Sequence, residues 1–185
     1  MKTAETFAEC STAKRLHVGA IVVKEDRIIS IGYNGMPSGW DNDCEYKDYM
    51  SDAGGWLSPE EIYEQWPFEE EDIDPELGYA RRYALKTKPE VLHAETNCIA
   101  KLAKSNESGM GATMFITHAP CLDCAKLIYQ SGIGSVLYRN SYRSDAGIDF
   151  LKQALFTAFE RLCGLQVDHV PLDVASFDLG CNLGQ

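Results

Sequence analysis

The sequence has 185 residues, and its 17 Lys and Arg against 28 Asp and Glu give a formal net charge of −11. Apolar residues make up 45% and charged residues 24%, which is typical of a globular protein and excludes a wholly disordered one. No apolar run reaches the roughly 20 residues that a membrane span needs, and the acidity disfavours contact with a long nucleic acid.

The first third of the chain predicts a short helix and a hairpin. The helix lies within residues 3–14, and two strands rich in Val and Ile follow at 17–24 and 27–33. Glu25 and Asp26 form a tight polar turn between the strands, so together they predict a β-hairpin. Residues 34–39 have turn composition throughout.

An acidic segment at about residues 41–88 interrupts this pattern. It has no Lys or Arg between Asp48 and Ala80, and nine acids accumulate from Glu60 to Glu76 among aromatic residues. We interpret it as a long surface insertion with one short helix at 59–66, inside a single domain that spans residues 1–185. Such a charge run usually forms a solvated surface segment without a catalytic role, and we favour this interpretation here.

Helices and strands alternate after the insertion. Helices are predicted at 91–104, 121–131 and 147–163, and strands at 112–117, 135–138 and 166–170. Strands that are separated by helices of 10 to 15 residues indicate βαβ units. We therefore expect an α/β protein with three αβα layers, in which a mixed sheet lies between helices.

His93 and the pair Cys121 and Cys124 form a pattern typical of a catalytic zinc site. One nitrogen and two thiolates make three ligands and leave a fourth position open, as in catalytic zinc sites. The seven cysteines, an odd number, predict reduced intracellular thiols rather than a disulfide framework. His93 and Cys121 are each expected at the start of a helix, where the helix dipole favours ionised thiols.

Glu95 is two residues beyond His93 and is expected to move protons rather than to bind the metal. A carboxylate there can take a proton from water and pass it to a ring nitrogen and a leaving amine. The order H-x-E followed by P-C-x-x-C is the signature of zinc nucleobase deaminases. A structural zinc half-site or a redox Cys pair is the alternative, but a redox pair has no role for His93 and Glu95.

With these motifs, the chain resembles the cytidine-deaminase-like superfamily and, within it, the deoxycytidylate (dCMP) deaminases. The narrower signals are the block VGAIVV at 18–23, the hexapeptide GYNGMP at 32–37, HAE-x-N at 93–97 and CAKLI at 124–128. The resemblance implies the αβα fold and the hydrolysis of dCMP to dUMP and ammonia, which feeds thymidylate synthesis.

The resemblance also implies roles for individual residues. His93, Cys121 and Cys124 match the zinc ligands, and Glu95 matches the proton shuttle. Asn34 matches a residue that contacts the substrate sugar, the backbone around Ala119 accepts from the exocyclic amine, and Tyr142 matches an aromatic near the nucleotide.

Regulation and assembly are implied in the same way. Many family members are hexamers that dCTP activates and dTTP inhibits, with a regulatory pocket near the turn that holds Gly32, Tyr33 and Gly35. We expect Zn²⁺ as cofactor, with Mg²⁺ accompanying an effector nucleotide, a homo-oligomer, and a cytoplasmic location (the host cytoplasm for a viral protein).

One departure from the family pattern concerns a second, structural zinc. Relatives often have a Cys where this chain has Ala13, and use it together with one like Cys44. We therefore expect a single catalytic zinc.

Two other hypotheses remain open. A nucleoside or nucleic-acid cytidine or adenosine deaminase would share the metal motif, although the acidity disfavours a nucleic-acid substrate. A catalytically inactive module that senses dCTP or dTTP would not need His93, Glu95, Cys121 and Cys124.

Overall fold

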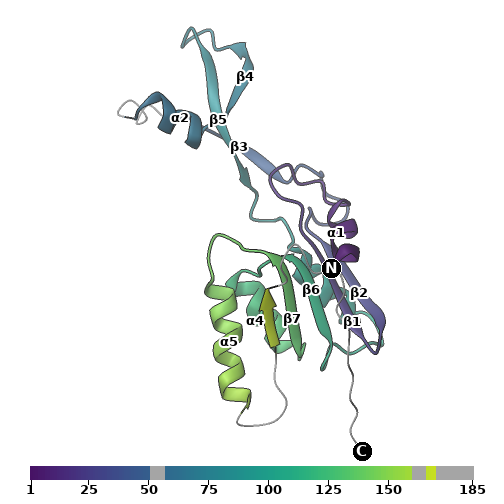
Figure 1. Ribbon diagram of the computed structural model, residues 1–185. Helices are drawn as coiled ribbons and strands as arrows, with labels where there is room; N and C mark the ends of the chain where they lie inside the picture. Colours follow the sequence, from purple (N-terminus) through teal and green to yellow (C-terminus); the bar gives the residue numbers. More distant parts are fainter. Residues whose placement is uncertain (51–56, 160–165, 170–185) are drawn as a thin grey trace, which may run out of the picture. The chain divides into compact units, whose positions relative to one another are not determined.

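The computed structural model describes residues 1–50, 57–159 and 166–169 (Figure 1). These residues form two compact units. The first unit contains Met1–Ser11, His17–Asn34 and the described part of His93–Gln185, and the second contains Thr12–Leu16 and the described part of Gly35–Leu92. The second unit is thus wider than the predicted insertion, since it begins at Gly35 and includes a short piece of the N-terminal segment.

The first unit is built on a five-stranded mixed sheet in the order β2-β1-β6-β7-β8. Strand β1 is antiparallel to both β2 and β6, whereas β6, β7 and β8 are parallel. The bounds of the strands are β1 Gly19–Lys24, β2 Arg27–Tyr33, β6 Thr113–His118, β7 Ser135–Asn140 and β8 Gln166–His169. Glu25 and Asp26 have φ values of 50° and 59°, as a two-residue hairpin turn requires, so the predicted hairpin is confirmed.

Helices cover both faces of this sheet, and the predicted three-layer αβα fold is confirmed. The helices are α1 Lys2–Ala8, α3 Ala94–Leu102, α4 Leu122–Gln130 and α5 Ala146–Phe159. Side chains from α3, α4 and α5 form one buried core with Ala20, Met114 and Ile116 of the sheet. Helix α1 packs against the opposite face of the sheet. Gly19 of β1 contacts α1, and because side chains alternate along a strand, Gly19 faces away from the core that contains Ala20.

The observed elements begin and end within a few residues of the predicted ones. Helix α3 begins at Ala94 rather than at residue 91, and β6 runs from Thr113 to His118. The last four residues of the predicted helix at 147–163, and residue 170 of the predicted last strand, lie outside the described residues. Within the described ranges, no helix is long and apolar enough to cross a membrane.

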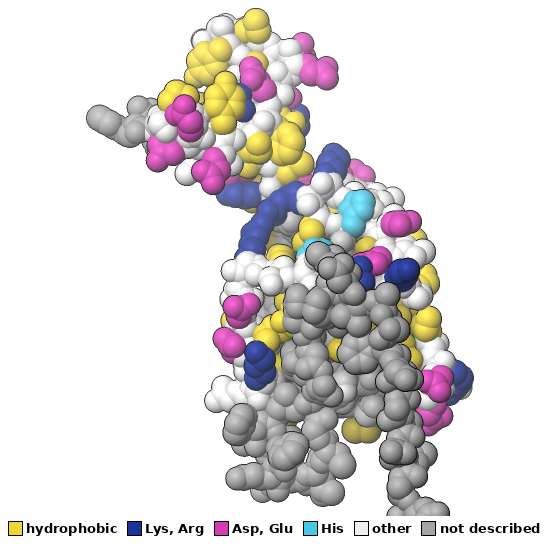
Figure 2. All heavy atoms as spheres, viewed as in Figure 1, with side chains coloured by type: hydrophobic (Ala, Val, Ile, Leu, Met, Phe, Trp, Pro, Cys, Tyr) yellow, Lys and Arg dark blue, Asp and Glu magenta, His cyan; other side chains and the backbone are white. Residues whose placement is uncertain are grey.

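The second unit contains a three-stranded antiparallel sheet that the sequence did not predict. Its strands are β3 Glu45–Tyr49, β4 Phe68–Ile73 and β5 Ala80–Thr87, in the order β3-β5-β4. The predicted short helix is α2 Pro59–Gln65, which begins with a capping box between Ser58 and Glu61. Acidic and hydrophobic side chains are interspersed on the visible surface of this unit (Figure 2).

Two buried groups join residues 12–16 to the rest of the second unit. The carboxylate of Glu45 is 3% exposed and accepts hydrogen bonds from the backbone N–H groups of Lys14 and Arg15. Ala13 packs with Cys44, Val91 and Met36 in a small apolar cluster. The side chain of Ala13 is therefore a methyl group in an apolar environment.

Candidate active site

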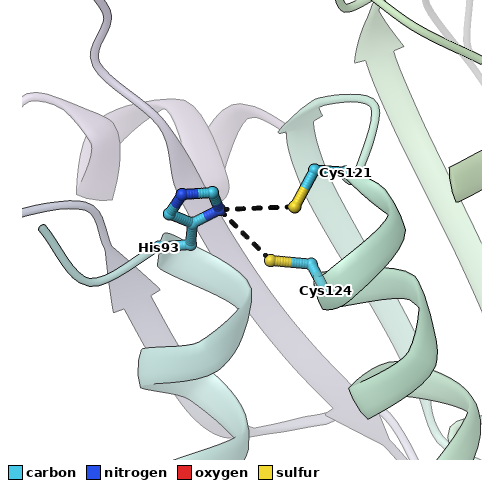
Figure 3. A group of neighbouring side chains, drawn as sticks. All are labelled: His93, Cys121 and Cys124. Atoms are coloured by element: carbon cyan, nitrogen blue, oxygen red, sulfur yellow. Dashed lines mark hydrogen bonds between the residues drawn. The ribbon is translucent and has the colours of Figure 1, made fainter. Parts of the chain in front are cut away.

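Two helices of the first unit begin at the residues predicted to bind a metal. His93 is the N-cap of α3 and Cys121 is the N-cap of α4, and both have extended backbone conformations. Neither side chain caps its own helix with a hydrogen bond, so both are available to the site. Cys124 lies in the first turn of α4, on the same side as Cys121 (Figure 3).

The three side chains form a compact donor set. The Nδ1 atom of His93 lies 3.7 Å from the Sγ atom of Cys121 and 3.3 Å from that of Cys124 (Figure 3). Zn–S and Zn–N bonds of ordinary length at a tetrahedral angle place the N and S atoms about 3.6 Å apart. Among the described residues, this is the one group of three potential ligands whose donor atoms lie within 4.8 Å of one another. The donors therefore fit zinc in both chemistry and spacing.

The two neighbouring thiols shift each other's pKa in opposite directions. The pKa of Cys121 is lowered to about 4, first by the hydrogen bond from Cys124 and next by the one from His93. The pKa of Cys124 is raised, chiefly because its proton is held by Cys121. The lowered pKa favours the thiolate form of Cys121, which is the form that binds a metal.

Glu95 lies in the first turn of α3 and is 4% exposed. Burial is the largest cause that raises the pKa of its carboxyl group, and its own backbone N–H and the nearby His93 oppose that shift. The carboxyl group is therefore buried two residues from His93, without being one of the three donors. Such a buried acid near a metal site is suited to exchange protons.

Helix α5 supports the loop that carries Cys121. A Cβ atom at Gly147 would lie 2.1 Å from the carbonyl oxygen of Pro120 and 2.9 Å from the carbonyl group of Cys121. Only glycine permits this approach of one backbone to another. The position of the Cys121 loop consequently depends on the start of α5.

Asn34 follows the last residue of β2 and is held by Val18. Its Oδ1 atom accepts a hydrogen bond of 2.8 Å from the N–H of Val18, and its own N–H donates to the Val18 carbonyl. The predicted sugar-contacting residue is thus fixed at the end of the β1–β2 hairpin.

Ala119 and Tyr142 follow the ends of β6 and β7. Ala119 is buried and its N–H donates to the carbonyl of Asn140, whereas none of the described residues donates to its own carbonyl. Tyr142 is 37% exposed, in the segment between β7 and α5. The carboxyl ends of parallel strands are a common place for ligand-binding residues in α/β proteins.

The three residues predicted near a regulatory nucleotide have different environments. Gly32 is buried in β2, where a Cβ atom would lie 2.1 Å from the carbonyl oxygen of Ala94. Tyr33 ends β2 with a partly exposed ring, and Gly35 exchanges two backbone hydrogen bonds with Leu92. This close approach of the α3 backbone is enough to explain why position 32 is a glycine, without any role in nucleotide binding.

Sequence reasoning assigned no role to Asn97 or Thr117. Asn97 donates a hydrogen bond of 2.8 Å to the carbonyl of Tyr33. Thr117 accepts from the N–H of Gly19 and lies 3.1 Å from Nδ1 of His118, whose pKa is lowered by burial. The HAE-x-N motif contains Asn97, but only the structure shows what its side chain contacts.

Comparison with known proteins gives a consistent result. Residues 1–140 match the family described as cytidine and deoxycytidylate deaminase zinc-binding region. The deoxycytidylate deaminase of Enterobacteria phage T4 is 36% identical over 171 residues, which cover 83% of this chain and 79% of the phage protein. Human deoxycytidylate deaminase is 32% identical over 147 residues, which cover 79% of this chain and 65% of the human protein.

A solved structure extends this similarity to the fold. The dCMP deaminase of cyanophage S-TIM5, crystallised in complex with dCMP and dUMP, has 38% sequence identity and a TM-score of 0.63, over 91% of this chain and 92% of that one. The chain therefore belongs to the deoxycytidylate deaminases, within the cytidine deaminase-like superfamily of zinc-binding enzymes.

Proposed function

We propose that this protein hydrolyses dCMP to dUMP and ammonia, a reaction that feeds thymidylate synthesis. The observation that carries the proposal is the donor set of His93, Cys121 and Cys124 with the buried carboxyl group of Glu95 against it. The similarity to a cyanophage dCMP deaminase that was crystallised with dCMP and dUMP supports the choice of substrate.

His93, Cys121 and Cys124 would hold a single catalytic zinc ion. When bound, zinc supplies the Lewis acidity that activates a water molecule for attack. The packing of Ala13 with Cys44 and Val91 supports one zinc site rather than two, because it fills the second position with apolar atoms.

Glu95 would move the protons of the reaction. Its carboxylate takes a proton from the attacking water as the new C–O bond forms at C4 of the cytosine ring, and passes that proton to N3. It then takes the second proton of the same oxygen and gives it to the 4-amino group. The C4–N4 bond breaks, ammonia leaves and a carbonyl group remains at C4. Burial raises the pKa of Glu95, which suits a group that must hold a proton during catalysis.

Three further residues would orient the nucleotide. Asn34 would contact the deoxyribose, the carbonyl of Ala119 would accept a hydrogen bond from the 4-amino group, and Tyr142 would lie near the nucleotide. The two hydrogen bonds of Asn34 with Val18, one through its side-chain Oδ1 and one through its backbone N–H, support this assignment, because they fix the residue before substrate arrives. A pre-positioned contact costs less entropy on binding than a mobile one.

Regulation and assembly belong to the same proposal. We expect a cytoplasmic homo-oligomer, a hexamer by analogy with the family, that dCTP activates and dTTP inhibits, with Mg²⁺ accompanying the effector. The effector would bind near Gly32, Tyr33 and Gly35. The net charge of −11 supports a free mononucleotide rather than a long nucleic acid as substrate.

The test is ammonia release from dCMP and from deoxycytidine, each measured with and without dCTP or dTTP. We expect rapid release from dCMP, far slower release from deoxycytidine, stimulation by dCTP and inhibition by dTTP. Equal turnover of deoxycytidine and dCMP would contradict the assigned substrate.

A further inference from the structure

Helix α3 packs along β2, which lies at the edge of the five-stranded sheet. The two backbones are in direct contact at Gly32, where a Cβ atom would lie 2.1 Å from the carbonyl oxygen of Ala94 and 2.8 Å from the N atom of Cys98. The hydroxyl group of Ser30 donates a hydrogen bond of 2.8 Å to the Cys98 carbonyl. The helix therefore has little freedom to slide along the strand.

Two side chains of α3 bind carbonyl groups of β2. Asn97 Nδ2 donates to the carbonyl of Tyr33 at 2.8 Å, and Lys101 Nζ donates to the carbonyl of Ile31 at 3.0 Å. The two donors are four residues apart, so they lie on one face of the helix. The two acceptors are two residues apart and point to the same side of the strand. Together the donors satisfy backbone groups that an edge strand would otherwise expose.

Unlike Lys101, Asn97 makes hydrogen bonds that connect His93 with the peptide group before Asn34. Its backbone N–H donates to the carbonyl of His93 at 3.0 Å, and its side chain binds the peptide group that immediately precedes Asn34. One residue thus contacts the backbone of a proposed zinc ligand and the backbone next to a proposed substrate contact. Lys101 binds the strand two residues earlier and has no such link.

We propose that Asn97 is a positioning residue for substrate binding, which fixes Asn34 at a set distance from His93 and Glu95. This inference rests on the proposed function, since it requires a nucleotide that spans the donor set and Asn34. Loss of the Asn97 side-chain hydrogen bond would let the 33–34 peptide group move. The KM for dCMP would then rise, while zinc binding, which depends on the starts of α3 and α4, would persist.

The test compares Asn97→Asp with Lys101→Met in full-length, zinc-loaded protein. The Asp side chain keeps the size of Asn but places an acceptor against the Tyr33 carbonyl. Because this variant replaces a donor by a second acceptor, we expect KM for dCMP to rise by about three- to tenfold, with kcat changed less and zinc content equal to wild type. Lys101→Met removes an equally exposed hydrogen bond to β2, at the Ile31 carbonyl and away from Asn34, and should change KM by less than about twofold.

Asn97→Ala serves where Asn97→Asp fails to fold, and it also allows a double-mutant cycle with Asn34→Ala. If Asn97 acts through Asn34, the double variant binds dCMP no more weakly than Asn34→Ala alone. Additive losses, an unchanged KM, or loss of zinc together with kcat would overturn the proposal. Absence of dCMP turnover by the wild-type protein would instead contradict the proposed function, so the two failures are distinguishable.

Discussion

The Nδ1 atom of His93 lies 3.3 Å from the Sγ atom of Cys124, although the two residues are 31 positions apart and belong to different helices. The sheet creates this proximity, because α3 and α4 pack on the same face with their first turns at one end of the core. A helix N-terminus favours negative charge, so both helix starts favour the anionic form that a thiol takes when it binds a metal.

Replacement of Glu95 by Gln should remove activity and leave the zinc site intact. The amide keeps the shape of the side chain but cannot accept and release a proton, and general acid–base catalysis contributes about 10²- to 10⁴-fold to a rate. We expect kcat for dCMP to fall by about that factor. Ammonia release and zinc content by elemental analysis would measure the two effects.

The matched control for this variant is Glu107→Gln, at an exposed carboxylate that forms a surface ion pair with Arg27. It should retain wild-type kcat. If Glu95→Gln were as active as Glu107→Gln, Glu95 would not be the proton carrier.

A methyl group at position 147 should weaken zinc binding without touching a ligand. In Gly147→Ala the new Cβ atom would overlap the carbonyl oxygen of Pro120 and push the loop that carries Cys121. Overpacking of this kind costs about 1–3 kcal/mol of folding free energy. We expect faster zinc loss to a chelator and a lower unfolding temperature.

Gly35→Ala is the steric control, because no atom lies within 4 Å of a Cβ built at that position. Its zinc retention and unfolding temperature should match those of wild type. Zinc retention by Gly147→Ala equal to that of Gly35→Ala would show that α5 does not support the site.

Part of this arrangement could be predicted from the sequence and part could not. The hairpin turn at Glu25 and Asp26, the βαβ alternation and the helix starts at His93 and Cys121 all depend on local residue patterns, and they were predicted. The contacts of Asn97 and Gly147 join segments that are far apart in the chain, and no local pattern encodes them.

The sheet of the second unit was missed for a different reason. Strand β4 reads FEEEDI, with only one of its six residues half-buried and the rest exposed, so it lacks the alternation of apolar and polar residues that identifies a strand. Its stability comes from cross-strand contacts instead. Phe68 stacks on Tyr83 of β5, and Lys47 of β3 pairs with Glu70 of β4. The acidic composition concealed these pairs.

Cys98 should resist alkylation in the folded protein. Burial raises the pKa of its thiol to about 12, and the S–H group donates to the carbonyl of Ala20. At pH 8 only about 10⁻⁴ of such a thiol is ionised, and the thiolate is the reactive form. Iodoacetamide labelling with peptide mass mapping should modify the exposed Cys10 and spare Cys98 until urea unfolds the protein. Labelling of both at equal rates would contradict the burial of Cys98.

Glu45 should contribute to the stability of the second unit. Glu45→Ala leaves the backbone N–H groups of Lys14 and Arg15 without their buried acceptor, at a cost of about 1–3 kcal/mol. Hydrogen exchange at these two amides should become faster than in wild type. Glu90→Ala, at an exposed carboxyl group of the same unit, should leave their exchange unchanged. Equal protection in both variants would show that Glu45 does not hold residues 12–16.

The most direct test of the central claim is the reaction of dCMP with the zinc-loaded protein in H₂¹⁸O. We predict one dUMP and one ammonia for each dCMP consumed, with one ¹⁸O atom in the uracil ring of the product by mass spectrometry. The label reports hydrolysis at C4, and Glu95→Gln should form no product on the same timescale. Failure of the zinc-loaded wild type to form dUMP, or formation of dUMP without ¹⁸O, would contradict the account.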